Sequence, residues 1–369
     1  MNIGVPTEIK AQESRISVIP ATVKQLTSRG HQVFVQAGAG LGSAYTDAQY
    51  AAAGATMVPD ANAVFEAAQL IVKVKEPQPS EIALLNESHT IFTYLHLAAS
   101  KTLTEDLLKT GCTAIAYETV EVGGRLPLLE PMSEIAGRMS SIVGCYHLAK
   151  NHGGRGILLG GVPGVAPGRV VVIGGGTAGI NAARVATGVG ADVTILDIDL
   201  ERMRFLDITM SGAHTLYSTE ANLSELLPRV DLVIGAVLVP GAAAPKLITR
   251  EMLKLLQPGS VLVDIAVDQG GCAETTRPTT HENPTYVEEN VLHYCVANMP
   301  GAYSRTSTQA LSNVTERYLL TLADLGVTEA LRKDRNLAKG LNVHQGQLTS
   351  APVAGAHGLP FISLDEALG

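Results

Sequence analysis

The chain has 369 residues, of which 46% are apolar and 17% charged, a composition that excludes a disordered protein. Its length exceeds the size at which one hydrophobic core stops growing, so we expect two domains, one of them built from non-contiguous chain. The net charge of −8 arises from 35 acidic and 27 basic residues without a basic block, which argues against nucleic-acid binding.

Targeting and redox signals favour a cytoplasmic protein. No run approaches the roughly 20 consecutive apolar residues of a membrane span, and the opening MNIGVPTEIK is strand-like, unlike a signal peptide. His147 and His152 are five residues apart, which is off the one-turn spacing of a helical metal pair. The cysteines form no CxxC pair, so we expect them in or near the core of a reduced protein without a metal site: Cys112, Cys145, Cys272 and Cys295.

Apolar, β-branched runs alternate with helical patterns from the start of the chain, which predicts an α/β fold of parallel βαβ units and not of hairpins. Helices are expected over residues 20–29 and 101–110, the second ending at Gly111. The strands expected in this first third are residues 1–6, 32–36, 70–75, 90–95 and 113–117.

A connecting helix is expected from Ser133, and a glycine-dense stretch follows it. A regular series of strands then predicts one Rossmann sheet, at residues 169–173, 192–197, 232–236, 261–267 and 293–297. The long helical pattern after Ser307 has a different character and is expected to complete the first lobe. We therefore predict a Rossmann domain over 129–306 and a Rossmann-like substrate domain over 1–128 and 307–369.

The clearest motif is GxGxxG at Gly174, Gly176 and Gly179, between an apolar strand and an alanine-rich helix. The first glycine makes the tight turn, the second lets the backbone approach a pyrophosphate, and the third permits close packing of helix on strand. The next strand ends on Asp197, where an acid accepts ribose hydroxyls and repels a 2′-phosphate. NAD is therefore favoured over NADP, although Arg202 and Arg204 lie close by.

Four further residues satisfy a positional rule for ligand binding. Ligands of open α/β sheets gather beyond the carboxyl ends of strands, and Lys75, His96 and Asp268 each lie at or just past such an end. Arg15, in the loop after the first strand, can offer a planar fork to a carboxylate, and Lys75 a point charge to a carbonyl oxygen. An imidazole such as that of His96 transfers protons near neutral pH.

Each of the four has a plainer explanation when taken alone. Arg15 and Lys75 would then be solvated surface cations, His96 a hydrogen-bonded structural residue, and Asp268 a turn cap. Asp264 lies within its strand, so we expect its side chain to serve packing or hydrogen bonding and not chemistry. The co-occurrence of a carboxylate-binding cation, a proton-transfer group and a dinucleotide motif nevertheless favours a dehydrogenase.

These stretches together resemble the alanine dehydrogenase family over essentially the whole chain. The matching strings are GVPTEIK, QAGAG, VKVKEP, FTYLHLAAS, AIAYETV, PMSEIAGR, GGRGILLGGVPGV, VVIGGGTAGINAARVA, DLVIGAVLVPGAAAPKL, VDIAVDQGGCAETTRPTTH, VANMPGA and LAKGLNVH. The segment AYSRTSTQ after MPG departs from the family pattern, and no candidate catalytic residue lies in it.

The resemblance implies the reversible NAD-dependent conversion of L-alanine to pyruvate and ammonium in a cytoplasmic homohexamer. It implies Arg15 and Lys75 as substrate ligands and His96 with Asp268 as the catalytic pair. Arg202 stands where the family often has Lys, which keeps the charge but changes the geometry. The cofactor contacts that it implies are Ser133, Gly174, Gly176, Thr177, Ala178, Gly179, Asp197, Arg202, Ser218, Val237, Leu238, Ile265, Ala266, Val267, Asp268, Arg277, Val296, Ala297, Asn298 and Met299.

Three other functions stay open at this point. The NAD(H)-binding component of proton-translocating transhydrogenase looks similar in both lobes, but has membrane-bound partners and passes hydride to a second nicotinamide protein. Another amino-acid or 2-oxoacid dehydrogenase of related fold is the second. A catalytically silent NAD-sensing module is the third, and it would have no need of the acid-base pair.

Overall fold

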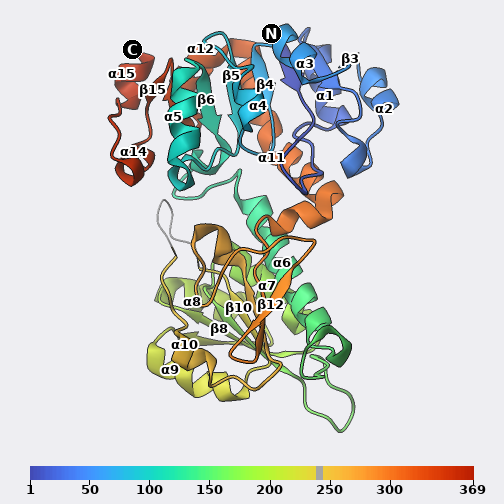
Figure 1. Ribbon diagram of the computed structural model, residues 1–369, viewed down its shortest axis with the longest axis vertical. Coiled ribbons are helices and arrows are strands. Elements are labelled where there is room, and N and C mark those ends of the chain that lie inside the picture. Colours follow the sequence, from blue (N-terminus) through green and yellow to red (C-terminus); the bar gives the residue numbers. More distant parts are fainter. Residues whose placement is uncertain (238–243) are drawn as a thin grey trace. The chain divides into compact units, whose positions relative to one another are not determined.

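The computed structural model describes residues 1–237 and 244–369, and the chain divides into two compact units (Figure 1). The first unit comprises Met1–Met132 and Tyr303–Gly369, and the second comprises Ser133–Ala302. The boundaries expected from the sequence, after residues 128 and 306, lie within about one helical turn of these divisions. No helix among the described residues is long and apolar enough to cross a membrane.

The first unit is built on a sheet with the strand order β15-β14-β6-β5-β4-β1-β2-β3. The pairs from β6 to β3 are parallel, whereas β14 pairs antiparallel with both β6 and β15. The strands are β1 (Asn2–Val5), β2 (Gln32–Gln36), β3 (Thr56–Val58), β4 (Leu70–Val72), β5 (Thr90–Thr93), β6 (Thr113–Ala116), β14 (Leu341–His344) and β15 (Gln347–Leu348).

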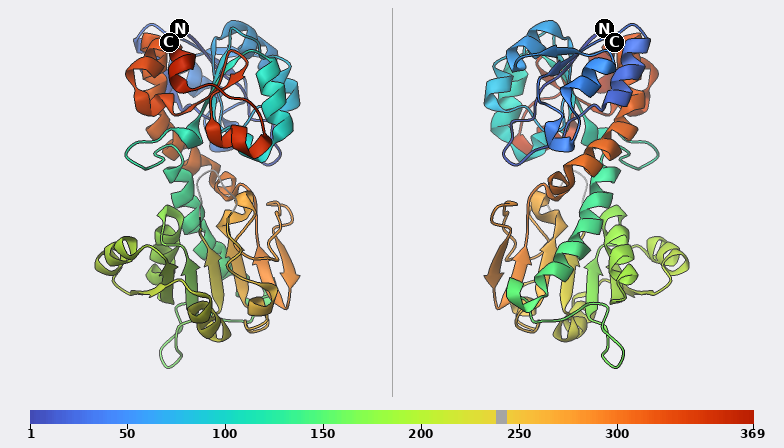
Figure 2. Two further views of the ribbon diagram at one scale, coloured as in Figure 1. Left: turned by 90° about the vertical axis from the view of Figure 1, so that its left-hand side faces the viewer. Right: turned by 90° about the vertical axis from the view of Figure 1, so that its right-hand side faces the viewer.

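Helices cover both faces of this sheet (Figure 2). On one face, α3 (Ala61–Ala67), α5 (Lys101–Lys109) and α14 (Ala351–His357) share a core with Ile71 and Ile91. The helix α5 begins where the Ser100 side chain accepts a hydrogen bond from Leu103 N–H. The other helices of the unit are α1 (Pro20–Ser28), α2 (Asp47–Ala52), α4 (Pro79–Ile82), α11 (Ser304–Leu325), α12 (Val327–Lys333), α13 (Arg335–Ala338) and α15 (Leu364–Leu368).

The second unit is a doubly wound sheet with the order β12-β13-β11-β10-β7-β8-β9. All pairs are parallel except that of β12 with β13. Its strands are β7 (Arg169–Ile173), β8 (Asp192–Asp197), β9 (Ala213–Tyr217), β10 (Leu232–Gly235), β11 (Val261–Asp264), β12 (Thr285–Glu288) and β13 (Val291–Tyr294). Its helices are α6 (Glu130–His147), which starts in the first unit, α7 (Thr177–Gly188), α8 (Leu200–Thr209), α9 (Glu220–Leu226) and α10 (Arg250–Leu253).

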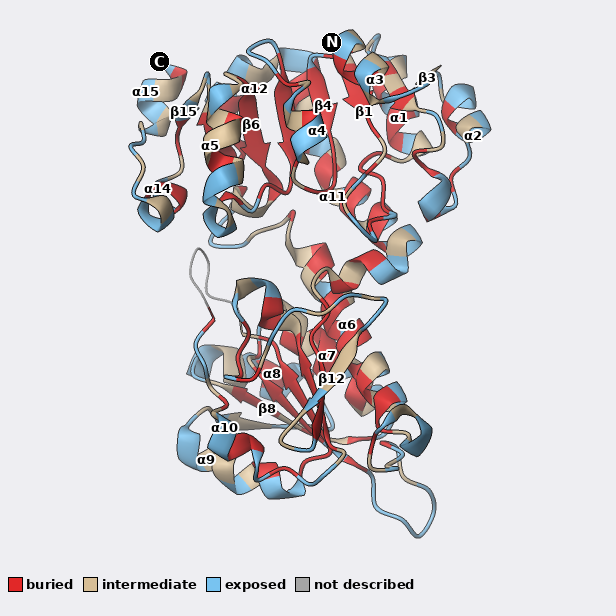
Figure 3. Ribbon diagram, in the orientation of Figure 1, coloured by how far each residue is buried: buried red, intermediate tan, exposed pale blue. Residues whose placement is uncertain are grey.

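Burial on both faces explains the apolar runs of these strands (Figure 3). In β7, Val170 and Val172 pack into one core with α7, whereas Val171 and Ile173 pack into another with α9 and α10. Continuous burial of this kind is typical of parallel strands covered by helices, and it confirms the predicted α/β class.

The structure corrects the expectation of parallel units without hairpins. The strands β12 and β13 are joined by Glu289 and Asn290, both with positive φ, and β14 and β15 by Gln345 and Gly346 in the same manner. Such two-residue turns usually carry Asn-Gly or Asp-Gly, and neither pair is present here. The predicted strands 261–267 and 293–297 also end earlier, at Asp264 and Tyr294, and the short or half-exposed β3 and β9 were not expected.

Candidate active site

Lys75 and His96 follow neighbouring strands of the first unit and lie at the same edge of its sheet. Each stands three residues beyond its strand, β4 or β5, which pair in parallel. The two segments stay joined past the strand ends, because Thr93 Oγ1 donates to the Lys75 carbonyl at 2.9 Å and Tyr94 N–H to the Val74 carbonyl at 3.2 Å. Lys75 and His96 therefore lie at one strand-end edge, as the positional rule predicts.

The Arg15 loop is attached to the same edge, and Arg15 is buried, with 2% of its surface exposed. Ser17 Oγ donates to the Val72 carbonyl at 2.8 Å, which ties this loop to β4. The guanidinium donates from Nε and Nη2 to the two carboxylate oxygens of Glu13 at 2.7 and 2.6 Å, and from Nη1 to Met132 Sδ at 3.0 Å. Burial opposes its charge, but the Glu13 carboxylate outweighs burial and raises the pKa of Arg15. The solvated-cation explanation is therefore wrong for Arg15.

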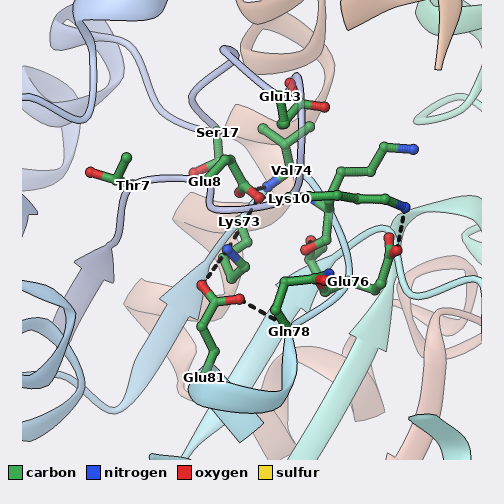
Figure 4. A network of polar contacts seen from close by, with 12 residues as sticks. Thr7, Glu8, Lys10, Glu13, Ser17, Lys73, Val74, Glu76, Gln78 and Glu81 are labelled. Atoms are coloured by element: carbon green, nitrogen blue, oxygen red, sulfur yellow. Dashed lines mark hydrogen bonds and ion pairs between the residues drawn. The ribbon is translucent and has the colours of Figure 1, made fainter. Parts of the chain in front are cut away.

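Lys75 is also buried, with 8% of its surface exposed, and a carboxylate holds its backbone. Glu8 accepts a hydrogen bond from Val74 N–H at 2.6 Å and a long one from Lys75 N–H at 3.4 Å. The same carboxylate contacts the Lys73 ammonium at 3.1 Å, and Glu81 contacts it from the other side at 2.6 Å (Figure 4). The segment that carries Lys75 thus rests on a buried ion network.

The buried ion network leads us to expect that Lys73→Met destabilises the fold. Burial opposes the charge of Lys73, but Glu8 and Glu81 raise its pKa, and burial raises the pKa of Glu8 against the influence of Lys73. Removal of the cation leaves two buried carboxylates, so the free energy of unfolding should fall by about 3–5 kcal/mol near pH 7.5. Because protonation of a buried carboxylate then favours the folded state, this deficit should shrink as the pH falls from 8 to 5.

Urea unfolding of the wild type and Lys73→Met at pH 8 and at pH 5 measures this loss of unfolding free energy. The exposed ion pair of Lys109 with Asp106 provides the control, since Lys109→Met should change stability little. A deficit that is equal at both pH values would mean that the carboxylates do not determine it.

The exposed side chain of His96 stands on a constrained backbone. Its φ and ψ are 51° and 36°, a left-handed conformation uncommon outside glycine but several-fold enriched for His. The imidazole lies parallel to the Tyr94 ring, with an interplanar angle of 10° and centroids 5.9 Å apart. Within the described residues, no protein group hydrogen-bonds the imidazole nitrogens, so the explanation of His96 as a hydrogen-bonded structural residue is wrong.

In the second unit, the three motif glycines have separate structural reasons. Gly174 has φ +98, and a Cβ on it would lie 2.7 Å from the Ala236 carbonyl oxygen. A Cβ on Gly179 would lie 1.8 Å from the Gly174 carbonyl oxygen, so the helix can approach the strand only with glycine here. Among residues 1–237 and 244–369, nothing would lie within 4 Å of a Cβ on Gly176. No packing contact of the described residues requires a glycine here, and the space that they leave beside it fits the approach of a pyrophosphate.

The glycine loop lies where the strand order reverses, between β7 and β10. The contact of Gly174 with Ala236 places Val237 beside the loop. Asp197 accepts from Gly175 N–H at 2.6 Å, and Ser218 N–H donates to the Asp197 carbonyl at 2.9 Å. Arg202 Nε donates to the Gly175 carbonyl, whereas Arg204 pairs with Glu201. The residues around this reversal of the strand order could hold a dinucleotide.

Asp268 lies in a short 3-10 helix, Ile265–Gln269, directly after β11, and its side chain is exposed. Asp264 is fully buried and accepts from Ala266 N–H, Cys272 N–H and Thr276 Oγ1 at 3.0, 2.7 and 2.6 Å. This confirms the structural role expected for Asp264. It also explains how the turn that presents Asp268 is held in place.

The other expected cofactor residues differ in accessibility. Ser133, Thr177, Ala178, Ile265, Ala297 and Asn298 are partly exposed, and Arg277 is exposed and stacks 3.9 Å from the Tyr286 ring centroid. Four side chains are buried, so a ligand would reach mainly their backbone: Ala266, Val267, Val296 and Met299. Leu238 lies outside the described residues. Across residues 1–237 and 244–369, no group of three or more His, Cys, Asp or Glu residues could hold a metal ion.

Three carboxylates that support the site were not expected from the sequence: Glu8, Glu13 and Glu118. Glu13 precedes Arg15 by two residues, and Glu118 follows β6 as His96 follows β5. The strand-end rule applied to β6 could have singled out Glu118. Applied to β1, the same rule could have singled out Glu8, which lies three residues beyond Val5, whereas Glu13 follows no strand end so closely.

Comparisons with known proteins match both units. The model of the alanine dehydrogenase/PNT N-terminal domain matches residues 4–136, and that of the alanine dehydrogenase/PNT C-terminal domain matches residues 140–351. An alanine dehydrogenase from Halomonas elongata is 55% identical over 371 residues, which cover 100% of this chain and 100% of that protein.

Solved structures match over the same range. A structure titled L-alanine dehydrogenase has a TM-score of 0.93 at 49% identity and covers 97% of this chain and 99% of its own. A transhydrogenase from Sinorhizobium meliloti, with a TM-score of 0.80 at 24% identity over 95% of this chain and 99% of its own, shares the fold. Both domain models and the full-length identity thus show that this chain belongs to the alanine dehydrogenase/PNT family.

Proposed function

We propose that this chain catalyses the reversible, NAD-dependent oxidative deamination of L-alanine to pyruvate and ammonium. The observation that carries the proposal is the meeting of Arg15, Lys75 and His96 at one strand-end edge, in a chain at least half identical to several alanine dehydrogenases. A small 2-oxoacid or amino acid needs two cationic contacts and one proton-transfer group, which is what this edge offers.

Arg15 and Lys75 bind the substrate in this proposal. Arg15 would hold the carboxylate, and Lys75 the oxygen of the carbonyl. Both side chains are buried, so their attraction for an anion is screened less than at a surface. The paired contact with Glu13 fixes the plane of the guanidinium before substrate arrives, which reduces the ordering that binding requires.

His96 and Asp268 move the protons. Bound NAD⁺ supplies the acceptor for the hydride that leaves the α-carbon. The amine then becomes an iminium, water adds to give a carbinolamine, and ammonia departs as the carbonyl forms. His96 would exchange a proton with the hydroxyl or carbonyl oxygen, while Asp268 would orient the water and balance the cationic imine.

The cofactor would lie along the carboxyl ends of the second unit's strands. The open space at Gly176 would accommodate the pyrophosphate, and Asp197 would accept the ribose hydroxyls. The nearby Arg202 and Arg204 already contact Gly175 and Glu201, respectively. This engages the cations that could bind a 2′-phosphate, and it therefore favours NAD over NADP. We further propose a cytoplasmic homohexamer, in line with the family resemblance.

The experiment is an assay of L-alanine oxidation followed by NADH absorbance near ~340 nm. We expect turnover with NAD⁺ far above that with NADP⁺, and Asp197→Ala should narrow the difference. Equal rates with both cofactors in the wild type would show that Asp197 does not select the ribose.

A further inference from the structure

We propose that Glu118 is a positioning residue, which holds the backbone of His96 in the conformation that presents the imidazole to the substrate. The inference rests on the proposed catalytic role of His96. It goes beyond that role because Glu118 would act through main-chain groups, without contacting the reacting atoms.

The sheet register places Glu118 beside His96. The strands β5 and β6 pair in parallel with Thr93 opposite Ala116, so two residues further along Glu118 lies level with Leu95. Glu118 Oε1 accepts from His96 N–H at 2.6 Å and from Leu95 N–H at 3.1 Å, and Oε2 accepts from Leu95 N–H at 3.2 Å. One carboxylate thus satisfies two consecutive backbone donors where the strand has ended.

Those two donors belong to the segment that leaves the strand for a left-handed turn. His96 has φ 51° and ψ 36°, and the short 3-10 helix Leu97–Ala99 follows it. A residue other than glycine keeps a left-handed backbone conformation when the surrounding structure determines it. The 2.6 Å bond from the His96 N–H to a charged acceptor is the contact that fixes the peptide on the N-terminal side of this residue.

The carboxylate of Glu118 has no competing partner in the part of the chain that the structure describes. Among the described residues, no Lys, Arg or His forms an ion pair with it, and all of its side-chain hydrogen bonds go to Leu95 and His96. The neighbouring acid Glu121, by contrast, forms an exposed ion pair with Lys339 at 2.7 Å. Glu118 is therefore committed to the His96 backbone, whereas Glu121 offers a matched control on the same segment.

The test compares Glu118→Ala and Glu118→Gln in two backgrounds, the wild type and His96→Asn, in steady-state amination of pyruvate. In the wild-type background, Glu118→Ala should lower kcat by about 10–100-fold because the imidazole is misplaced, while the KM for pyruvate changes little. Glu118→Gln keeps one acceptor oxygen and should fall between. Adding Glu118→Ala to His96→Asn should lower kcat no further, because no imidazole is left to position. Glu121→Ala should match the wild type.

The outcomes distinguish a failure of the positioning role of Glu118 from a failure of the proposed role of His96. Wild-type kcat in Glu118→Gln and Glu118→Ala would overturn the positioning role and leave the proposed function standing. An equal loss in both backgrounds would also overturn it, since the effect would not pass through His96. Full turnover by His96→Asn would instead overturn the proposed role of His96. If Glu118→Ala fails to fold, Glu118→Gln gives the same comparison.

Discussion

Replacement of His96 by Asn should lower turnover by about 100-fold or more in both directions, while NADH binding is retained. A positioned acid-base group typically contributes a factor of about 10²–10⁴ to the rate. Asn is the cleaner substitution because it tolerates the left-handed backbone at this position, whereas Ala adds strain. NADH binding should survive because His96 belongs to the first unit and the glycine loop to the second. Stopped-flow turnover and NADH fluorescence titration measure the two quantities.

Asp268→Ala should cause a comparable loss, and the double variant should lose far less than the product of the two single effects. Residues that serve one transition state behave as a unit, so removal of the second changes little once the first is gone. NADH affinity can fall in this variant, because Asp268 follows the carboxyl end of β11, along which we propose that the cofactor lies. Wild-type turnover in His96→Asn with an unchanged pH profile would remove His96 from the mechanism, and strict additivity would separate the two residues.

Substitution of Arg15 should abolish efficient use of pyruvate and leave NADH binding intact. Loss of one partner of a buried charge-assisted contact costs about 2–5 kcal/mol, which corresponds to roughly a 30-fold to several-thousand-fold fall in kcat/KM. Arg15→Lys keeps the charge and loses the fork, so it should recover only part of the efficiency. Because Glu13 is left buried by Arg15→Ala, the doubly substituted Glu13→Gln/Arg15→Ala chain separates substrate binding from stability.

The exposed Arg29, which pairs with Asp324, is the control for a lost cation in the same unit. Arg29→Ala should keep parental efficiency. Parental efficiency in Arg15→Ala would return that residue to a purely structural role with Glu13.

The fold class and the placement of most candidate site residues at strand ends were predictable because their causes are local. Gly174 must adopt a positive φ and Gly179 must admit a carbonyl, and both demands appear in the sequence as a motif. The positional rule likewise singled out Lys75 and His96, since strand ends can be located from apolar runs.

The partners of Glu8 and Glu118 were not predictable, because they depend on which strands become neighbours. Glu118 reaches His96 only because β5 pairs with β6, and an isolated glutamate after a strand is most often solvated. The hairpin at Glu289 and Asn290 was missed because its turn lacks the glycine that usually marks it. Asp268 was correctly placed after a strand, but the helical turn of Ile265–Gln269 depends on capping by Asp264, which is not visible in the apolar pattern.

The proposed alanine dehydrogenase activity is tested most directly by assaying the purified chain in parallel with two pairs of hydride donor and acceptor. One is L-alanine with NAD⁺, and the other is NADH with NADP⁺, as a transhydrogenase would use. We expect rapid NADH formation from L-alanine, its reversal by pyruvate with ammonium, and no hydride transfer between the two nicotinamides. Transfer from NADH to NADP⁺, with no NADH formed from L-alanine, would contradict the proposed activity.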